Sequence, residues 1–203
     1  MISLPKELLI ATKNEGKVRE IIELLKSINL SLTVKSLSDL KIYEEYEETG
    51  TTFSSNAIGK SLYYNKSSPY SLTIADDSGL MVEALDGKPG VFSARYSGIN
   101  STDKKNNEKL LEDLLPYKNR KAKFCTVVAV SINGKLIKTF EGDVSGVILT
   151  KPSGNNGFGY DPLFYYPPLK KTFAELSVEV KNNISHRATA IKKMIDYLKN
   201  LIS

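Results

Sequence analysis

The sequence predicts an α/β fold in which helices flank a mixed β-sheet. Two observations support this prediction: strand-like and helix-like apolar patterns alternate along the first half of the chain, and a hairpin pattern follows around Asn133-Gly134. Alternating strands and helices favour parallel pairing, whereas a hairpin adds antiparallel strands. We expect one domain over residues 1–203, because this length is close to the usual range of about 100–200 residues per domain.

The first half of the chain supplies the alternating elements. Apolar side chains at helical spacing predict helices, and short apolar runs predict strands. In chain order we expect a strand at Leu8–Thr12, a helix at Gly16–Ser27, a strand at Leu32–Val34, a helix from Ser54 toward Asn65, and a strand at Leu72–Ala75. The last strand is expected to end at the polar segment Asp76-Asp77-Ser78-Gly79.

The second half of the chain supplies a helix, a meander and a terminal helix. A helix is expected at Asp103–Leu115, with a cap among residues 101–103 and a stop at Pro116. Asn133-Gly134 is a strong hairpin signal, and it separates strands expected at Ala122–Ile132 and Lys135–Phe140. A third antiparallel strand is expected at Val144–Leu149. Helical spacing of apolar residues predicts the terminal helix, which contains Ile191, Met194, Ile195, Leu198 and Ile202.

Composition and charge exclude several classes of protein. The chain is 41% hydrophobic and 25% charged, which excludes collagen, coiled coil and wholesale disorder. A single cysteine, Cys125, and a single histidine, His186, exclude an intrachain disulfide, a multi-cysteine zinc site and any metal motif with two histidines. The net charge of +5 is compatible with phosphate-bearing partners without identifying one. Apolar runs are too short for a signal peptide or a membrane span, so we expect a cytoplasmic protein with no membrane partner.

The turn from Ala11 to Lys17 is a candidate anion site. It joins an expected strand to an expected helix, where backbone N–H groups and the Lys17 ammonium can bind phosphate. It is not a Walker A loop, because Ala11 and Val18 stand where that motif has a glycine and a hydroxyl residue. The alternative interpretation is an ordinary strand-to-helix turn in which Asn14 caps the helix.

Two acidic segments are candidates for a metal site. Asp76 and Asp77 follow an apolar strand, and side chains in a strand alternate between its faces, so at most one of the two is expected to face a given cleft. Four glutamates lie within residues 44–48. Carboxylate oxygens suit Mg²⁺, which is commonly held by one or two carboxylates and by substrate phosphates. The alternatives are a polar turn and a solvated acidic loop.

Two later segments are candidates for binding a base or an anion. The loop of residues 153–162 contains three glycines and two aromatic residues, so its backbone can approach a ligand and Phe158 can stack on a base. A packed loop with aromatic plugs is the alternative. Ser185-His186-Arg187 opens the terminal helix, with Lys181 just before it. Arg187 and Lys181 favour an anion or a base edge as the ligand, whereas a lone histidine is more often a cap or a core residue.

Taken in order, these segments resemble the inosine/xanthosine triphosphate pyrophosphatase family, which hydrolyses purine nucleotides. The matching blocks are ATKNEGK at 11–17, EETGTTFSSNA at 47–57, ADDSGL at 75–80, GKPGVFSARYSG at 87–98, GNNGFGYDPLF at 154–164, TFAEL at 172–176 and KNNISHRA at 181–188. The blocks span almost the whole chain in the family's order. The resemblance implies an elongated α/β structure in which two lobes flank a central substrate cleft, and it implies a homodimer.

The resemblance also implies roles for individual residues. Asp77 matches the general base and a metal ligand, and Glu48 matches a second metal-linked carboxylate, although Glu47 leaves the register open. Lys13 stands where the family often has a small residue, and we interpret it as an exposed substitution. The substrate-binding matches are Thr12, Lys13, Asn14, Glu15, Gly16 and Lys17 in the first turn, Ser78, Phe158, Gly159, Tyr160 and Asp161, and Lys181, His186 and Arg187.

The expected reaction is hydrolysis of ITP, dITP or XTP to the monophosphate and pyrophosphate, with Mg²⁺ as cofactor. Arg187 and His186 are the expected donors to O6 of the purine, with Phe158 stacked on its ring, and the lysines at 17 and 181 are expected to neutralise phosphate oxygens. We expect no nucleic-acid polymer as partner. The alternatives are a pyrophosphatase for pyrimidine or other modified nucleotides, a non-catalytic nucleotide-binding module, and a nucleic-acid-binding module.

Overall fold

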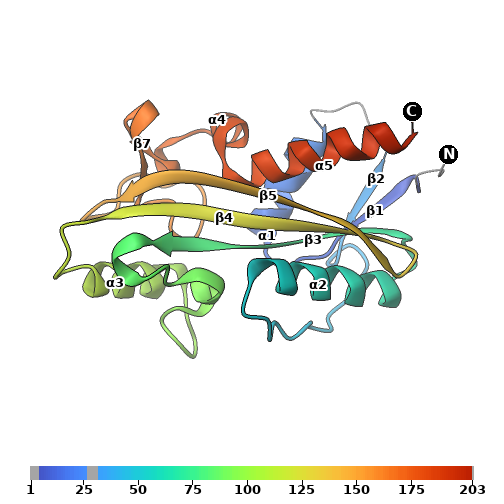
Figure 1. Cartoon of the computed structure of the whole chain (residues 1–203), viewed down its shortest axis with the longest axis horizontal. Helices are drawn as coiled ribbons and strands as arrows, with labels where there is room; N and C mark the ends of the chain where they lie inside the picture. Colours follow the sequence, from blue (N-terminus) through green and yellow to red (C-terminus); the bar gives the residue numbers. More distant parts are fainter. Residues whose placement is uncertain (1–4, 27–31, 203) are drawn as a thin grey trace. The chain divides into compact units, whose positions relative to one another are not determined.

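The computed structural model describes residues 5–26 and 32–202, and these form a seven-stranded sheet with flanking helices (Figure 1). The strands are β1 (Glu7–Ile10), β2 (Thr33–Ser36), β3 (Leu72–Val82), β4 (Lys121–Ile132), β5 (Lys135–Ile148), β6 (Phe164–Tyr166) and β7 (Lys171–Thr172). The α-helices are α1 (Glu15–Lys26), α2 (Phe53–Ser67), α3 (Asp103–Asp113), α4 (Val178–Ile184) and α5 (His186–Ile202). Short 3₁₀ helices lie at Glu83–Leu85, Gly90–Arg95, Pro167–Leu169 and Phe173–Glu175.

The sheet is mixed, which confirms the predicted α/β class. Its strand order is β2-β1-β3-β4-β5-β6-β7. β1 pairs in parallel with both β2 and β3, while β6 pairs antiparallel with β5 and with β7. The parallel part comes from the alternating first half of the chain, where helices connect the strands, as parallel pairing requires.

The described chain divides into two compact units. The first unit comprises residues 5–26, 32–77, 126–142 and 187–202, and the second comprises residues 78–125 and 143–186. The long strands β3, β4 and β5 therefore each contribute residues to both units. Each unit contains a hydrophobic core of its own.

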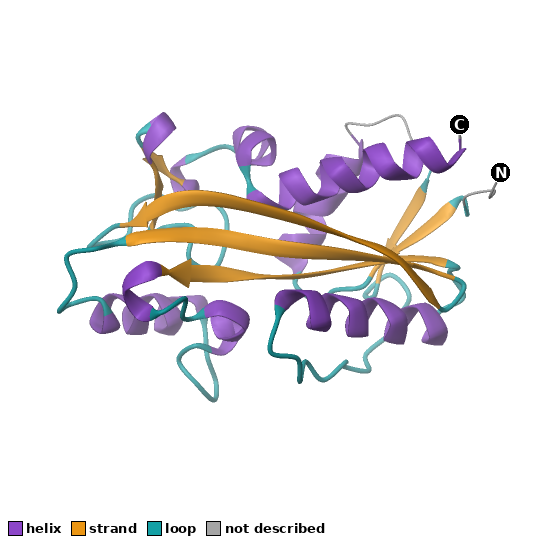
Figure 2. Ribbon diagram, viewed as in Figure 1, coloured by secondary structure: helices purple, strands orange, loops and turns teal. Residues whose placement is uncertain are grey.

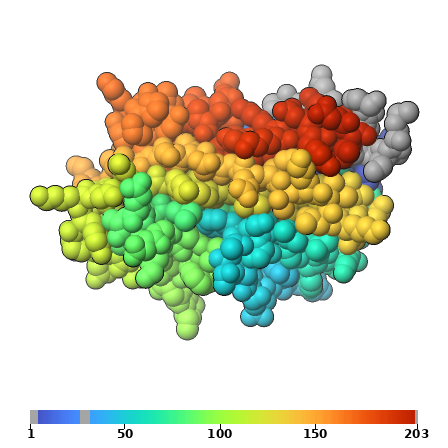
Figure 3. All heavy atoms as spheres, viewed as in Figure 1, coloured from blue at the N-terminus to red at the C-terminus, as the bar shows by residue number. Residues whose placement is uncertain are grey.

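In the first unit, helices cover both faces of the strands. Alternate residues of β1 divide between the faces: Leu8 and Ile10 pack in a core with α1 and α5, while Leu9 packs with Tyr64 of α2 in a smaller core. Figure 2 shows α2 on one side of these strands and α5 on the other. In the space-filling view the side chains of α5 lie directly against those of β5 (Figure 3), where the rings of Phe140 and Tyr197 are 5.5 Å apart.

The second unit is built around a core of large apolar side chains. Phe124 of β4 lies 4.5 Å from Phe164 of β6, ring centroid to ring centroid, and Phe173 packs on both. Gly146 of β5 allows this packing, because a Cβ at that position would lie 2.6 Å from the ring of Phe164. A larger residue in β5 would therefore displace the ring.

The predicted hairpin is confirmed at Asn133-Gly134. These residues have φ values of 50° and 76°, which are the left-handed conformations of the type I′ turn that favours Asn-Gly. The turn is fixed to the rest of the first unit: the Asn133 N–H donates to the Ser71 carbonyl at 2.9 Å, and the Gly134 N–H donates to Oδ1 of Asn65 in α2.

Two strand boundaries differ from the prediction. β3 does not end before Asp76 but continues to Val82, because the two aspartates are buried among charged and polar partners and need no turn toward water. The separate strand expected at Val144–Leu149 is part of β5, in which exposed Glu141 and Asp143 alternate with buried residues. β6, β7 and α4 have no counterpart among the predicted elements.

The remaining predicted helices and strands agree with the structure within a few residues. Ser27, the expected last residue of the first helix, lies outside the described residues. Within residues 5–26 and 32–202, no helix combines the length and apolarity needed to cross a bilayer.

Candidate active site

The turn between β1 and α1 is a capped turn with one lysine directed inward. The Lys17 N–H donates to Oδ1 of Asn14 at 3.0 Å, and the Asn14 N–H donates to Oγ1 of Thr12 at 3.2 Å. The helix cap by Asn14, which the alternative interpretation of this turn predicted, is therefore present. The ammonium of Lys17 lies 3.1 Å from Oδ2 of Asp76, whereas that of Lys13 donates to the carbonyl of Tyr43 at 2.7 Å. The two lysines of the turn thus have separate partners.

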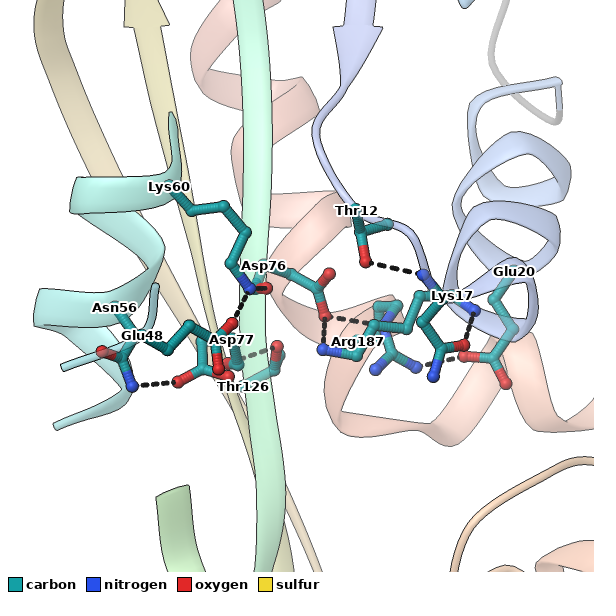
Figure 4. Close-up of polar contacts among 11 residues, drawn as sticks. Thr12, Lys17, Glu20, Glu48, Asn56, Lys60, Asp76, Asp77, Thr126 and Arg187 are labelled. Atoms are coloured by element: carbon teal, nitrogen blue, oxygen red, sulfur yellow. Dashed lines mark hydrogen bonds and ion pairs between the residues drawn. The ribbon is translucent and has the colours of Figure 1, made fainter. Parts of the chain in front are cut away.

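Asp76 and Asp77 contact different elements of the first unit, as strand alternation predicts (Figure 4). Oδ2 of Asp76 accepts from Nε of Arg187 in α5 at 3.2 Å, in addition to its contact with Lys17 of α1. Oδ2 of Asp77 accepts from the Asn56 amide of α2 at 3.0 Å. Both side chains are buried, with 1% and 5% of their surface exposed. The strand therefore separates one ion-paired carboxylate from one that is bound by a neutral amide.

Lys60 of α2 is a charged member of this site that the sequence analysis missed. Its ammonium pairs with the carboxylate of Glu48 and donates to the carbonyl of Asp76 at 3.1 Å. Lys60 lies four residues after Asn56, so both side chains share the inward face of α2. The signal that could have identified Lys60 is its position four residues after Asn56, since two polar side chains at this spacing lie on one face of a helix. Glu47, the alternative to Glu48, is exposed.

The charges shift the pKa values of the two aspartates in opposite directions. Burial alone raises the pKa of Asp76, but the charges of Lys17 and Arg187 outweigh it and hold that pKa well below its usual range. Burial raises the pKa of Asp77, and the nearby Glu48 raises it further against the effect of Lys17 and Lys60. Asp76 is therefore the more acidic and Asp77 the more basic carboxyl group of the pair.

The pKa of Lys17 is lowered. Burial is the largest cause, and the charges of Lys60 and Arg187 act in the same direction, while Asp76 opposes them. Lys60 differs, because Glu48 and the aspartates outweigh its burial and raise its pKa. Lys17 is thus the cation of this site that loses its proton first as the pH rises.

Arg187 has different neighbours from those that the sequence predicted. Its guanidinium is 1% exposed and pairs through Nη1 with Glu20 of α1 and through Nε with Asp76. Glu20, which the sequence analysis did not single out, lies one helical turn after Gly16 on the buried face of α1. Two of the guanidinium donors that were expected at a purine edge are therefore occupied by carboxylates. Recognition of the base by Arg187 stays a prediction.

The second unit brings together Phe158, Asp161 and Lys181. Oδ2 of Asp161 accepts from the Phe158 N–H at 3.0 Å and pairs with the ammonium of Lys181, which lies 4.9 Å from the centre of the Phe158 ring. Gly157 is required beside them, since its φ is +76° and a Cβ there would lie 2.0 Å from Asp161 Oδ2. Lys181 is thus a neighbour of the aromatic loop.

The other expected residues of the second unit have individual positions. Tyr160 is a core residue: it is 4% exposed, and its hydroxyl donates to the Ser93 carbonyl at 2.8 Å. The plug interpretation of the loop therefore holds for Tyr160, whereas Phe158 is half-buried. The ring of His186 stacks on Phe124 at 4.9 Å. Ser78 lies in β3 and is half-buried.

The family model described as Ham1 family matches residues 8–197. The chain belongs to the Ham1 family. The predicted resemblance to the inosine/xanthosine triphosphate pyrophosphatases is confirmed, because relatives of this Ham1-family chain carry the name dITP/XTP pyrophosphatase. One from Geobacter sulfurreducens is 49% identical over 195 residues, covering 94% of this chain and 96% of the relative. Another from Bacillus subtilis is 47% identical and covers 96% and 98%.

Solved structures of Ham1 proteins have the same fold. The Ham1 protein of Staphylococcus aureus matches with a TM-score of 0.84 and 44% identity, covering 96% of this chain and 99% of that one. A structure named nucleoside-triphosphatase / dITP/XTP pyrophosphatase from Mycobacterium abscessus matches with a TM-score of 0.71 and 38% identity, covering 93% and 98%. The α/β arrangement is thus a property of the Ham1 family.

The buried ion pairs of Arg187 predict a large effect on stability. Replacing Arg187 by Ala in this Ham1-family chain removes the guanidinium that pairs with two buried carboxylates, those of Glu20 and Asp76, so we expect a loss of about 3–5 kcal/mol in the free energy of unfolding. Urea denaturation measures it. Arg19→Ala, which removes an exposed arginine of α1 next to Glu20, is the control and should change stability by less than about 0.5 kcal/mol. Equal losses in the two variants would contradict the expectation.

Proposed function

We propose that this chain hydrolyses deaminated purine nucleoside triphosphates, such as ITP, dITP and XTP, to the monophosphate and pyrophosphate. The observation that carries the proposal is the buried group of charges in the first unit, in which Lys17 and Lys60 neighbour the carboxylates of Asp77 and Glu48. This reaction needs cations that neutralise the phosphate oxygens and a basic carboxylate that accepts a proton from the attacking water. The names of its Ham1-family relatives support the choice of substrate.

Asp77 is the general base in the proposed mechanism. A water molecule attacks the α-phosphorus, its proton passes to the Asp77 carboxylate, and pyrophosphate leaves with the electrons of the broken P–O bond. Before a metal ion binds, burial raises the pKa of Asp77, so its carboxylate is then a more basic proton acceptor than an exposed aspartate. The Asn56 amide holds Oδ2, and the Thr126 hydroxyl donates to the Asp77 carbonyl at 3.2 Å, so backbone and side chain are both oriented.

The carboxylates of Glu48 and Asp77 fit a magnesium ion. They lie close enough for Glu48 to raise the pKa of Asp77, and a cation would remove this repulsion. Within the described residues no group of three or more acidic, histidine or cysteine side chains forms a complete metal cage. Mg²⁺ commonly uses one or two carboxylates and completes its shell with water and substrate phosphates. When bound, the ion would neutralise phosphate charge and orient water.

Lys17 and Lys60 would neutralise the triphosphate, together with backbone groups of residues 12–17. Asp76 holds the Lys17 ammonium by its side chain and the Lys60 ammonium by its carbonyl, so one residue positions both cations. Lys13 is a member of the predicted turn, but its ammonium is engaged by Tyr43 and Glu45. We therefore propose that Lys17, and not Lys13, neutralises the phosphate oxygens.

The loop around Phe158 would bind the base. Its half-buried ring offers a stacking surface, Gly157 and Gly159 give the backbone the turn it needs, and Asp161 with Lys181 supplies polar groups beside the ring. Tyr160 supports the loop from the core. Ser78, His186 and Arg187 remain proposed substrate contacts from the family resemblance.

We also propose that the enzyme acts in the cytoplasm as a homodimer and has no nucleic-acid partner. The homodimer rests on the resemblance to the pyrophosphatase family. The single cysteine supports a reducing compartment.

A product assay on a nucleotide panel tests the proposal. With Mg²⁺ present we expect pyrophosphate and monophosphate from ITP, dITP and XTP, and slow turnover of ATP and GTP. For ATP, a donor aimed at O6 meets a second donor in the amino group of adenine, which is a costly mismatch in a buried site. Slow turnover of GTP, which keeps O6, requires a site that does not accept its 2-amino group. Excess EDTA should abolish the activity. Orthophosphate released from ATP as the main product, or full activity in EDTA, would contradict the proposal.

Asp77→Asn tests the general base. The amide keeps the shape of the side chain but cannot accept the proton of water, so we expect kcat to fall at least about 10²–10⁴-fold. Far-ultraviolet circular dichroism should be unchanged. Asp143→Asn, at an exposed position of β5, is the matched control and should retain wild-type kcat. A near-normal kcat in Asp77→Asn would exclude Asp77 from the role.

The lowered pKa of Lys17 predicts an alkaline limit to activity. The Lys17 ammonium is present below its pKa and is lost as the pH rises through that value. As the pH is raised, kcat/KM for ITP should therefore begin to decrease before the pH reaches 10.5, the usual pKa of lysine. Lys17→Arg keeps its charge at every accessible pH and should move the limit upward. Lys13→Arg in the same turn is the control, and its pH profile should match the wild type. If the alkaline decrease in kcat/KM occurs at the same pH in Lys17→Arg as in the wild type, a group other than Lys17 causes it.

A further inference from the structure

Helix α3 contacts the loop that carries Phe158. Both belong to the second unit, and an open cavity of about 590 Å³ is lined by residues of the helix and of the loop. Asp103 and Asn107 are among its lining residues on the helix side. They lie one turn apart, so their side chains project from the same face of α3.

The two side chains bind both polar groups of Gly159. Oδ2 of Asp103 accepts from the Gly159 N–H at 2.7 Å, and Nδ2 of Asn107 donates to the Gly159 carbonyl at 2.9 Å. Gly159 has a φ of +62°, and a Cβ there would meet nothing within 4 Å. A glycine is therefore favoured at position 159 because of the positive φ, and not because a side chain would find no space. The contacts from α3 hold this backbone conformation.

The contact of Asp103 to the Gly159 N–H holds the peptide group that follows Phe158. The N–H of Phe158 is held by Asp161, and the next N–H along the chain, that of Gly159, is held by Asp103. The peptide groups on both sides of the Phe158 Cα are thus anchored by side chains. Because two fixed peptide planes fix φ and ψ between them, they also fix the direction of the Cα–Cβ bond.

We propose that Asp103 and Asn107 are positioning residues for binding of the purine base, which they orient through Gly159 and Phe158. This inference rests on the proposed function, in which Phe158 stacks on the base. Neither residue touches the reacting phosphate. Their loss therefore weakens binding equally in the ground state and the transition state, which raises KM and leaves kcat unchanged.

Asp103 also acts on α3 itself, and this effect has different consequences from the contact to Gly159. An acidic residue in the first turn of a helix stabilises the helix by itself, and this effect involves no base. The Asn107 Oδ1 atom is buried and has no hydrogen-bond partner within the described part of the chain, so the amide acts through its donor end. A substitution that removes this donor while keeping the shape is therefore specific for the Gly159 contact.

Two substitutions that change the net charge in opposite directions test the positioning role. Asp103→Ala removes a negative charge and Asn107→Asp adds one, yet each breaks a bond to Gly159. We expect both to raise KM for ITP about 3- to 10-fold with kcat within about 2-fold, as the loss of one hydrogen bond predicts. Inhibition by inorganic triphosphate, which has no base, should be unchanged. A general electrostatic effect on the triphosphate would instead shift KM in opposite directions.

Matched controls separate positioning from stability and from charge. Asp103→Asn keeps an acceptor for the Gly159 N–H and should restore KM to within about 2-fold of wild type. Asn100→Asp makes the same change as Asn107→Asp at an exposed position before α3, and should leave KM unchanged. Amide hydrogen exchange in residues 153–163 should be faster in Asp103→Ala and Asn107→Asp than in wild type, while exchange in β4 stays unchanged, which gives a readout that does not need turnover.

The Phe158→Ala variant distinguishes failure of this inference from failure of the proposed function. If wild-type protein releases no pyrophosphate from ITP, or Phe158→Ala leaves KM unchanged, the proposed function of the loop is wrong and this inference falls with it. If Phe158→Ala raises KM but Asp103→Ala and Asn107→Asp do not, the inference alone is overturned. Opposite KM shifts in those two variants, or unchanged hydrogen exchange, would also overturn it.

Discussion

A carboxylate buried in the middle of β3 organises the first unit of this protein. Asp76 accepts from Lys17 of α1 and from Arg187 of α5, and its carbonyl accepts from Lys60 of α2. A buried charge is tolerated only when other charges or hydrogen bonds compensate it. Three helices that are far apart in the sequence are therefore connected to one strand residue, and the cations proposed to bind phosphate are held by the same residue.

The alternation of side chains along β3 divides the chemistry of the site. Consecutive residues of a strand point to opposite faces, so Asp76 meets the cations of α1 and α5 while Asp77 meets Asn56 of α2. One aspartate is kept ionised by its partners, and its neighbour is made more basic by burial. Two identical side chains obtain different roles from the geometry of a strand alone.

The second unit shows how a glycine-rich loop becomes ordered. Gly157 makes room for the Asp161 carboxylate, Asp161 holds the Phe158 N–H, and α3 holds both polar groups of Gly159. Tyr160, the residue that follows, anchors the loop in the core. Glycines give the chain access to conformations that other residues rarely adopt, but side chains from elsewhere select one of them. The stacking surface of Phe158 is thus fixed by residues distant in the sequence.

The sequence by itself determined the α/β class, the Asn133-Gly134 hairpin, the terminal helix and the two neighbourhoods of candidate residues, because periodicity, turn chemistry and short motifs are local properties. It did not determine that β3 continues through Asp76 and Asp77, since a polar segment continues a strand only when distant charges compensate it. It also missed Lys60 and Glu20, and it did not show that Arg187 pairs with Glu20 and Asp76. Those assignments depend on which charged side chains meet in a buried place, and only the tertiary structure decides that.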